Sequence, residues 1–230
     1  MLESVFSFLK ENYFLIGYAI TLIISMAFYR RYFDTVLRYF PILITYTFLN
    51  EFLGYMVKTN QDLSFFPQEL KYSSYNEILY NIYAVVSFGF FYHVYWNLIS
   101  NKTYRKCIVI GSCICAIAYM VSCFFQSPMD TQLFYATALG SVILVFFILL
   151  YFKDKINNRR KIIQPYNLMF WVSLSLLMFY SIFPALYLTG YLNYRIWEAY
   201  HLRSILRVLI VLMHILFIIG FFKGRRHSFG

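Results

Sequence analysis

Two arginines lie one helical turn apart inside a strongly apolar stretch near the end of the chain. Arg203 and Arg207 occur within HLRSILRVLIVLMHILF, residues 201–217. A guanidinium group stays charged and offers five N–H donors, which suit carboxylates and phosphates. Charges within membrane-spanning helices are rare and normally face one another or a water-filled cavity. The pair therefore predicts an ion-pair network or a site for a small anionic or zwitterionic ligand.

Acidic and amide side chains from two other segments are expected at a similar height. Counting about 1.5 Å per residue from the predicted helix ends places Arg203 roughly 9 Å and Arg207 roughly 15 Å inside the membrane. The same count places Glu51 at roughly 10 Å and Asn81 at roughly 9 Å, with Glu77 one turn nearer the boundary. Further hydrogen-bonding groups are expected from Asn50, Tyr80 and Tyr180. Whether this cluster is scaffolding between helices or a ligand site stays open, and the two roles can coexist.

Two histidines suggest a second, weaker kind of chemistry. His93 and His214 both fall in the predicted inner third of their segments, where a metal or heme between them is conceivable. At 100° per residue, however, His214 shares the face of Arg203, whereas His93 lies about 160° from Glu77. Because both polar sets cannot easily point at one axis, packing histidines are the favoured interpretation, and no cofactor is expected.

Helices that cross a membrane must position these residues. The chain has 230 residues, of which 61% are hydrophobic, 23% aromatic and only 13% charged, which excludes an ordinary soluble domain. A bilayer core of about 30 Å needs roughly 20 apolar residues in a helix. Apolar stretches of this length predict an all-α integral membrane protein, a single seven-helix bundle. Its expected spans are 12–29, 38–57, 75–99, 107–125, 132–152, 165–188 and 197–222.

Two features within these spans predict local packing. Pro184 is expected to kink or end the sixth span, because proline removes a helical hydrogen bond. Ala136 and Gly140, four residues apart in the fifth span, form a small-x-x-x-small pattern. This pattern predicts a close contact with a helix of this chain or of another.

The basic residues predict the orientation. Lysine and arginine near span ends are retained on the cytoplasmic side. With the N-terminus outside and the C-terminus cytoplasmic, the outer segments hold four basic residues: Lys10, Lys58, Lys71 and Arg195. The inner segments hold fourteen: Arg30, Arg31, Arg38, Lys102, Arg105, Lys106, Lys153, Lys155, Arg159, Arg160, Lys161, Lys223, Arg225 and Arg226. A basic face against an anionic lipid bilayer explains the net charge of +10 without a nucleic-acid partner.

Motifs for other activities are missing from the sequence. The chain has no Gly-x-Ser-x-Gly motif, no glycine-rich phosphate loop and no His-Glu-x-x-His pattern. A retinal Schiff base would need a lysine within a span, and every lysine lies outside the predicted spans. An enzyme is therefore less favoured than a binding protein.

Three segments carry a resemblance to a known group of proteins. NEFLGY (50–55), YNEILYNIY (75–83) and SFGFFYHVYW (87–96) resemble uncharacterised seven-helix membrane proteins of Bacteroidota. The resemblance implies a bacterial inner membrane and a link to signalling. The favoured hypothesis is a receptor-like or accessory subunit that binds a ligand in its outer half and relays to a membrane or cytoplasmic protein partner. The alternatives are a structural or transport subunit of a larger complex and, third, an intramembrane metal or heme enzyme.

Overall fold

The computed structural model contains helices and no strand over the residues that it describes, 13–59, 73–129, 131–157 and 167–224. The all-α prediction is therefore confirmed for this part of the chain. The α-helices are α2 (Tyr13–Ala27), α3 (Phe40–Thr59), α4 (Ser73–Leu98), α5 (Lys102–Phe125), α6 (Phe134–Asn157), α7 (Leu168–Leu192), α8 (Tyr194–Ala199) and α9 (Leu202–Lys223). One 3-10 turn, Tyr29–Arg31, follows α2.

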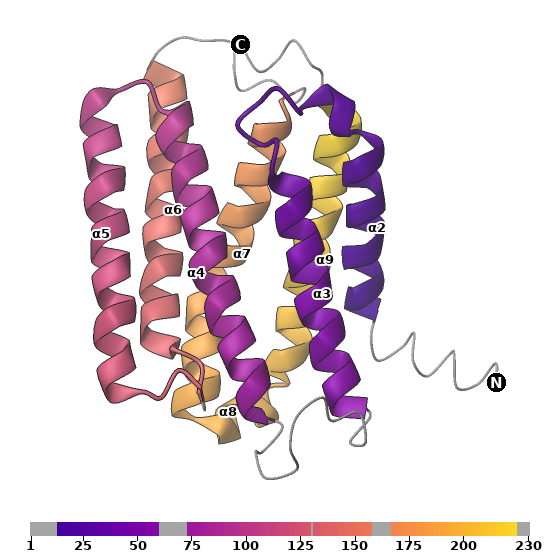
Figure 1. The fold of residues 1–230 in the computed structure, drawn as a ribbon, viewed down its shortest axis with the longest axis vertical. Helices are drawn as coiled ribbons and strands as arrows, with labels where there is room; N and C mark the ends of the chain where they lie inside the picture. Colours follow the sequence, from indigo (N-terminus) through magenta and orange to yellow (C-terminus); the bar gives the residue numbers. More distant parts are fainter. Residues whose placement is uncertain (1–12, 60–72, 130, 158–166, 225–230) are drawn as a thin grey trace, which may run out of the picture.

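Six of the long helices form a ring. Each of α2, α3, α4, α6, α7 and α9 contacts the next, and α9 closes the ring by contacting α2. The remaining long helix, α5, stands outside the ring against α4 and α6, at the left edge of Figure 1. The ring therefore has an interior lined by six helices, whereas α5 packs on one side of it.

Five helices are long and apolar enough to cross a membrane: the Glu77–Leu98 part of α4, α5, α6, α7 and α9. Helix α2 is apolar but has only 15 residues, and α3 is not among the five. The outer faces of the bundle carry large exposed side chains such as Ile23, Ile114 and Phe124. Because burying apolar surface is favourable, these faces suit lipid rather than water. The chain thus has the features of a multi-pass membrane protein.

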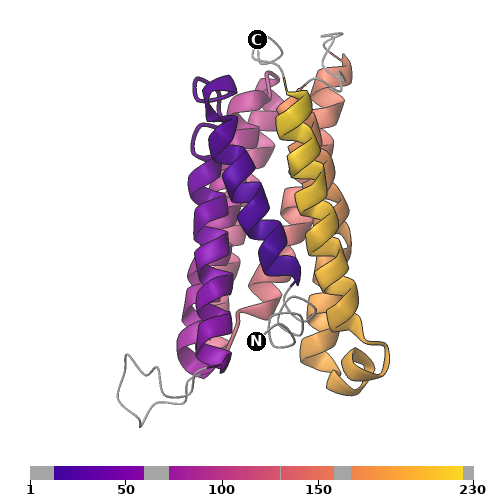
Figure 2. The same cartoon turned by 90° about the vertical axis from the view of Figure 1, so that its right-hand side faces the viewer.

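The last predicted span differs from the structure. Instead of one helix over 197–222, the short helix α8 lies between the end of α7 and the start of α9, and α9 begins only at Leu202 (Figure 2). His201, between them, has a φ of 49°, in the left-handed region. This break moves Arg203 from the expected second turn of a helix to the first turn of α9. Arg203 therefore lies closer to the end of the bundle than the sequence predicts.

Helix α7 continues beyond its predicted end at residue 188. Pro184 lies inside the helix, which extends to Leu192. Since proline has no N–H, the carbonyl of Tyr180, four residues earlier, has no helical donor. The proline is therefore accommodated within the helix rather than ending it.

The small-residue pattern of α6 packs against a helix of the same chain. Ala136 and Gly140 are buried, and a Cβ added to Gly140 would lie 2.8 Å from a ring carbon of Phe88 in α4. The hydroxyl of Tyr92 also donates to the Gly140 carbonyl at 2.8 Å. Glycine is thus needed here for the close approach of α4 to α6.

Basic side chains gather at one end of the bundle, called the basic end. The ends of α2, α4, α6 and α9 and the starts of α3, α5 and α7 meet at this end, which is uppermost in Figure 1. The basic residues in or next to these helix ends are Arg30, Arg31, Arg38, Lys102, Arg105, Lys106, Lys153, Lys155 and Lys223. At the opposite end, called the cavity end, the described side chains include only the basic residues Arg195 and Arg203. Tyr13 and Lys223, the ends of the first and last described helices, lie at opposite ends of the bundle.

Aromatic rings fill the interior of the ring toward the basic end. We call Phe40, Phe91, Phe217 and Phe221 the aromatic layer; all four are buried. The centroid of Phe40 lies 5.2 Å from that of Phe217 and 6.2 Å from that of Phe91, both edge-on. Such contacts stabilise packing beyond the area that they bury. The interior is therefore closed on this side.

Candidate functional site

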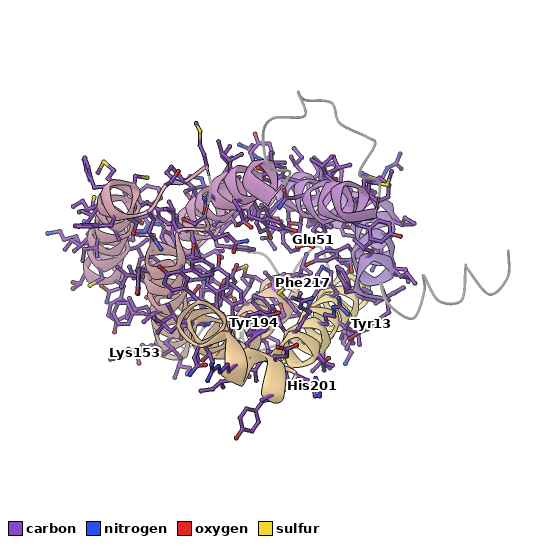
Figure 3. The ribbon with its side chains drawn as sticks, turned by 90° about the horizontal axis from the view of Figure 1, so that it is seen from below. Tyr13, Glu51, Lys153, Tyr194, His201 and Phe217 are labelled. Atoms are coloured by element: carbon purple, nitrogen blue, oxygen red, sulfur yellow. The ribbon has the colours of Figure 1, made fainter. Side chains whose placement is uncertain are left out.

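The interior of the ring opens into a cavity of about 640 Å³ toward the cavity end. Helices α2, α3, α4, α6, α7 and α9 all contribute to its wall, together with α8. Figure 3 looks at this end of the bundle, with Glu51 of α3 above the interior and Tyr194 of α8 below it. A cavity of this size is in the range of small-molecule sites.

Three charged side chains from three helices line the cavity: Glu51, Glu77 and Arg203. The hydroxyl of Tyr80 donates to Glu51 Oε2 at 3.4 Å. Glu77 interacts with the side chain of Gln132, yet its Oε2 is buried and has no hydrogen-bond partner among the described residues. A buried carboxylate oxygen without a donor is costly. The site therefore has unused capacity for a hydrogen-bond donor or a cation.

Arg203 is exposed in the first turn of α9 and faces the same cavity. Within the part of the chain that the structure describes, it forms no ion pair with Glu51 or Glu77. The expected neutralisation of the arginines by these carboxylates is therefore not seen. The cavity instead holds two carboxylates and one guanidinium as separate groups, each of which is available to a ligand.

Aromatic side chains make up much of the wall. Six tyrosines line it: Tyr18, Tyr80, Tyr83, Tyr180, Tyr187 and Tyr194. They are joined by Phe88, Phe134, Phe179, Phe183 and Trp197. Aromatic faces attract cations and pack well against flat or apolar groups. The wall thus combines apolar surface with phenol hydroxyls, as expected for a site that orients a small organic molecule.

Arg207 has different surroundings from Arg203. It is half-buried and does not line the cavity. Its guanidinium carbon lies 5.4 Å from the ring centroid of Phe14 in α2, a cation–π distance. In the described part of the structure, Arg207 therefore contributes to the packing of α9 against α2.

Besides Arg207, two further predicted site residues, Asn81 and Asn50, lie outside the cavity wall. Asn81 is buried, and its amide nitrogen donates to the carbonyls of Pro128 and Thr131 at 2.8 and 3.0 Å. Its oxygen accepts from the backbone N–H of Leu133 at 2.9 Å, so Asn81 holds the turn between α5 and α6. Asn50 is buried in α3 and also does not line the cavity. Tyr80 and Tyr180, the other two predicted residues, do line it.

Several wall residues were not predicted from the sequence. Gln132 precedes α6 and accepts a short hydrogen bond from the hydroxyl of Tyr187. Trp197 of α8 covers Gly190 of α7, where an added Cβ would lie 3.0 Å from the indole ring. The signal for Gln132 is its position as a polar residue at the start of an apolar span. Nothing in the sequence marks Trp197, because its place depends on the turn between α7 and α8.

The two histidines lie apart from the cavity wall. His214 is buried, with Nδ1 at 2.8 Å from the Ile210 carbonyl and its ring centroid 4.3 Å from that of Tyr18. His93 is exposed on α4, with Nε2 at 3.0 Å from the amide nitrogen of Asn97. Over the described ranges there is no group of three or more His, Cys, Asp or Glu side chains placed to hold a metal ion.

Comparisons with protein-family models, with curated proteins and with solved structures found no match for this chain.

Proposed function

We propose that this chain is a seven-span, receptor-like or accessory membrane protein that binds a small zwitterionic ligand in the cavity. The observation that carries the proposal is the meeting of Glu51, Glu77 and Arg203 in one aromatic-walled cavity. Binding is transmitted to a protein partner at the basic end. The ligand would supply opposite charges to these three groups, which form no ion pair with one another in the described part of the chain.

The charges favour a zwitterion over a simple anion. A carboxylate or phosphate on the ligand would pair with the guanidinium of Arg203. An ammonium group would pair with Glu51 or Glu77 and with the faces of neighbouring tyrosines such as Tyr80. With two carboxylates against one guanidinium, a ligand that carried only negative charge would leave both carboxylates unsatisfied.

The seven-span arrangement rests on α2 and α3 in addition to the five apolar helices. Both present apolar side chains outward, among them Ile16 and Ile20 in α2 and Ile42 and Leu49 in α3. The basic end is placed in the cytoplasm by the positive-inside rule, which puts the cavity on the outer side. The bacterial inner membrane and the link to signalling rest on the resemblance of residues 50–55, 75–83 and 87–96.

Ligand binding to purified full-length protein in detergent tests the proposal. The probes are the common α-amino acids, choline and acetate, each added separately during thermal unfolding. A zwitterion at saturating concentration is expected to raise the melting temperature by about 5 °C. Choline and acetate should have smaller effects, because each carries only one of the two charges.

Matched variants connect the shift to the cavity. Glu51→Gln and Arg203→Gln are expected to abolish the ligand-induced shift, whereas Arg207→Gln keeps it, because Arg207 lies one turn away and outside the wall. A shift that survives in Arg203→Gln contradicts the proposal. If no probe changes the melting temperature, the cavity groups are scaffolding, as in a structural or transport subunit of a larger complex.

A further inference from the structure

A groove of about 620 Å³ runs between α4 and α5 on the outside of the bundle. It exists because α5 stands outside the ring and touches α4 less closely than it touches α6. Exposed residues form its rims, among them Val85 and Trp96 on α4 and Val109 and Ala116 on α5. Since these rims face outward, the groove opens to the surroundings of the bundle rather than to the cavity.

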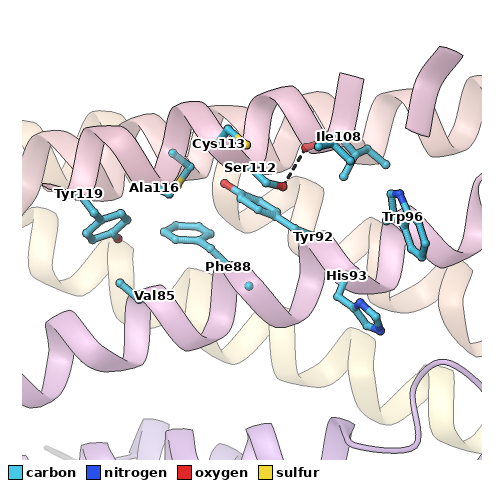
Figure 4. A pocket seen from close by; sticks show the side chains of 13 residues that line it. Val85, Phe88, Tyr92, His93, Trp96, Ile108, Ser112, Cys113, Ala116 and Tyr119 are labelled. Atoms are coloured by element: carbon cyan, nitrogen blue, oxygen red, sulfur yellow. Dashed lines mark hydrogen bonds between the residues drawn. The ribbon is translucent and has the colours of Figure 1, made fainter. Parts of the chain in front are cut away.

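The floor and walls of the groove are effectively apolar. Phe88, Tyr92 and Ile108 form the floor and are buried (Figure 4). The Tyr92 hydroxyl is already used by the Gly140 carbonyl, and the Ser112 hydroxyl donates to the Ile108 carbonyl at 2.8 Å. The exposed His93 also lines the groove, with its Nε2 at 3.0 Å from the amide nitrogen of Asn97. Because these polar groups have partners within the protein, the groove offers mainly hydrocarbon contact.

A cation stands where the groove reaches the basic end. The guanidinium carbon of Arg105 lies 5.2 Å from the ring centroid of Trp96, which lines the groove. Its Nε donates to the Ile99 carbonyl at 2.6 Å, which fixes the side chain in place. The two terminal nitrogens make no hydrogen bond within the described part of the chain. They remain available to an anion next to the apolar groove.

We propose that this groove holds an acyl chain of an anionic phospholipid whose phosphate is bound by Arg105. An apolar groove with a guanidinium at its basic end matches the two parts of such a lipid. The basic end also faces the leaflet in which anionic lipids attract lysine and arginine. Lys102 and Lys106, both exposed on α5 near Arg105, add to this attraction.

The dimensions favour a hydrocarbon chain over a helix from another protein. The groove follows α4 from Val85 to Trp96, a length of roughly 16 Å at 1.5 Å per residue. The hydrocarbon core of a bilayer is about 30 Å thick, so this length corresponds to roughly one leaflet. A transmembrane helix would extend well beyond the groove, whereas an acyl chain of one leaflet matches it in length.

Native mass spectrometry of the purified full chain tests this proposal. The probes are phosphatidylglycerol and phosphatidylcholine with the same acyl chains, added to the detergent-solubilised protein. We expect wild-type protein to retain phosphatidylglycerol about fivefold better than phosphatidylcholine. Arg105→Gln is expected to remove this preference, whereas Lys153→Gln, at the same end but away from the groove, keeps it.

Two glycines provide a matched pair for the acyl chain. Gly89 lines the groove, and Gly17 lies on α2; an added Cβ meets nothing within 4 Å at either position. Gly89→Leu should fill the groove and abolish lipid retention, while Gly17→Leu retains it. Ala116→Leu, from the opposite rim, gives the same result as Gly89→Leu if the latter fails to fold.

Three outcomes would overturn the proposal. One is equal retention of the two lipids by wild-type protein. Another is unchanged retention in both groove-filling variants. The third is a wild-type dimer that Gly89→Leu converts to a monomer with unchanged lipid retention, because the groove would then be occupied by a second copy of the chain.

Discussion

Arg203 and Arg207 show how strongly one turn of helix changes the role of the same residue type. Arg203 lies in the first turn of α9 and faces the cavity, whereas Arg207 is half-buried against the ring of Phe14. A cation in apolar surroundings is stabilised by an aromatic face or by a water-filled space. Arg207 is stabilised by the ring of Phe14, whereas Arg203 faces the cavity. Of the two, Arg203 is therefore the one available to a ligand.

Asn81 is expected to contribute to stability rather than to binding. Asn81→Ala removes three hydrogen bonds to Pro128, Thr131 and Leu133, and it leaves the N–H of the buried Leu133 without this acceptor. We expect the free energy of unfolding to fall by about 1–3 kcal/mol. Reversible unfolding in mixed micelles, followed by circular dichroism, measures the change.

Asn97→Ala is the control for this prediction. Among the described residues, the Asn97 side chain bonds to the carbonyl and ring of His93 in its own helix, so its loss breaks no hydrogen bond between described segments. A loss of stability as large as that of Asn81→Ala would contradict the structural role assigned to Asn81.

At the scale of the elements, the break between α8 and α9 fixes the position of Arg203. His201 adopts a left-handed conformation between the end of α8 and the start of α9. Non-glycine residues adopt this conformation at a cost, because Cβ approaches the backbone. The turn is therefore maintained by the packing on both sides of it, including Trp197 against Gly190.

Substitutions at His201 measure that cost. His201→Gly and His201→Ala both remove the imidazole, so they differ mainly in backbone preference. We expect the glycine variant to be more stable than the alanine variant by about 1 kcal/mol, the reverse of their order within a helix. Thermal unfolding of the two proteins compares them. Equal or reversed stability would show that residue 201 is not left-handed in solution.

At the scale of the whole molecule, the cluster of basic side chains and the cavity lie at opposite ends of the helical ring. This polarity predicts that the α4–α5 turn is cytoplasmic and the α5–α6 turn is external. Thr103→Cys and Met129→Cys, each in a protein whose native cysteines are replaced by alanine, test the two turns. A membrane-impermeant maleimide added to intact cells is expected to label only Met129→Cys.

The labelling pattern has a clear control. Cells that are opened before the reagent is added should give labelling at both positions, because both residues are exposed. Labelling of Thr103→Cys alone in intact cells would show the opposite orientation, in which the cavity end faces the cytoplasm.

The sequence predicted helices better than it predicted contacts between them. The expected span 75–99 agrees with α4, since a long apolar run leaves few other choices. Helix α5 begins at Lys102 rather than at 107, because Asn101 caps it by accepting from the N–H groups of Thr103 and Tyr104. Hydropathy alone treats the charged first turn as a loop, although the cap makes it helical.

For the candidate site, the sequence predicted only how far along its helix each residue lies. Counting residues placed Glu51 and Glu77 at the same end, and the structure has both in one cavity. The direction of each side chain depends on segments far away in the chain. Asn81 points to the 128–133 turn, and the start of α9 depends on a backbone conformation at His201 that has no hydropathy signal.

Helix α9 connects the two halves of the interior. Arg203 stands in its first turn, and Phe217, roughly 21 Å further along the helix axis, packs edge-on against Phe40 in the aromatic layer. If α9 moves as a rigid body about a point between these two residues, a shift of its first turn also shifts Phe217. A molecule that draws the first turn of α9 toward Glu51 would then change the phenylalanine contacts of the aromatic layer, at the basic end of the bundle.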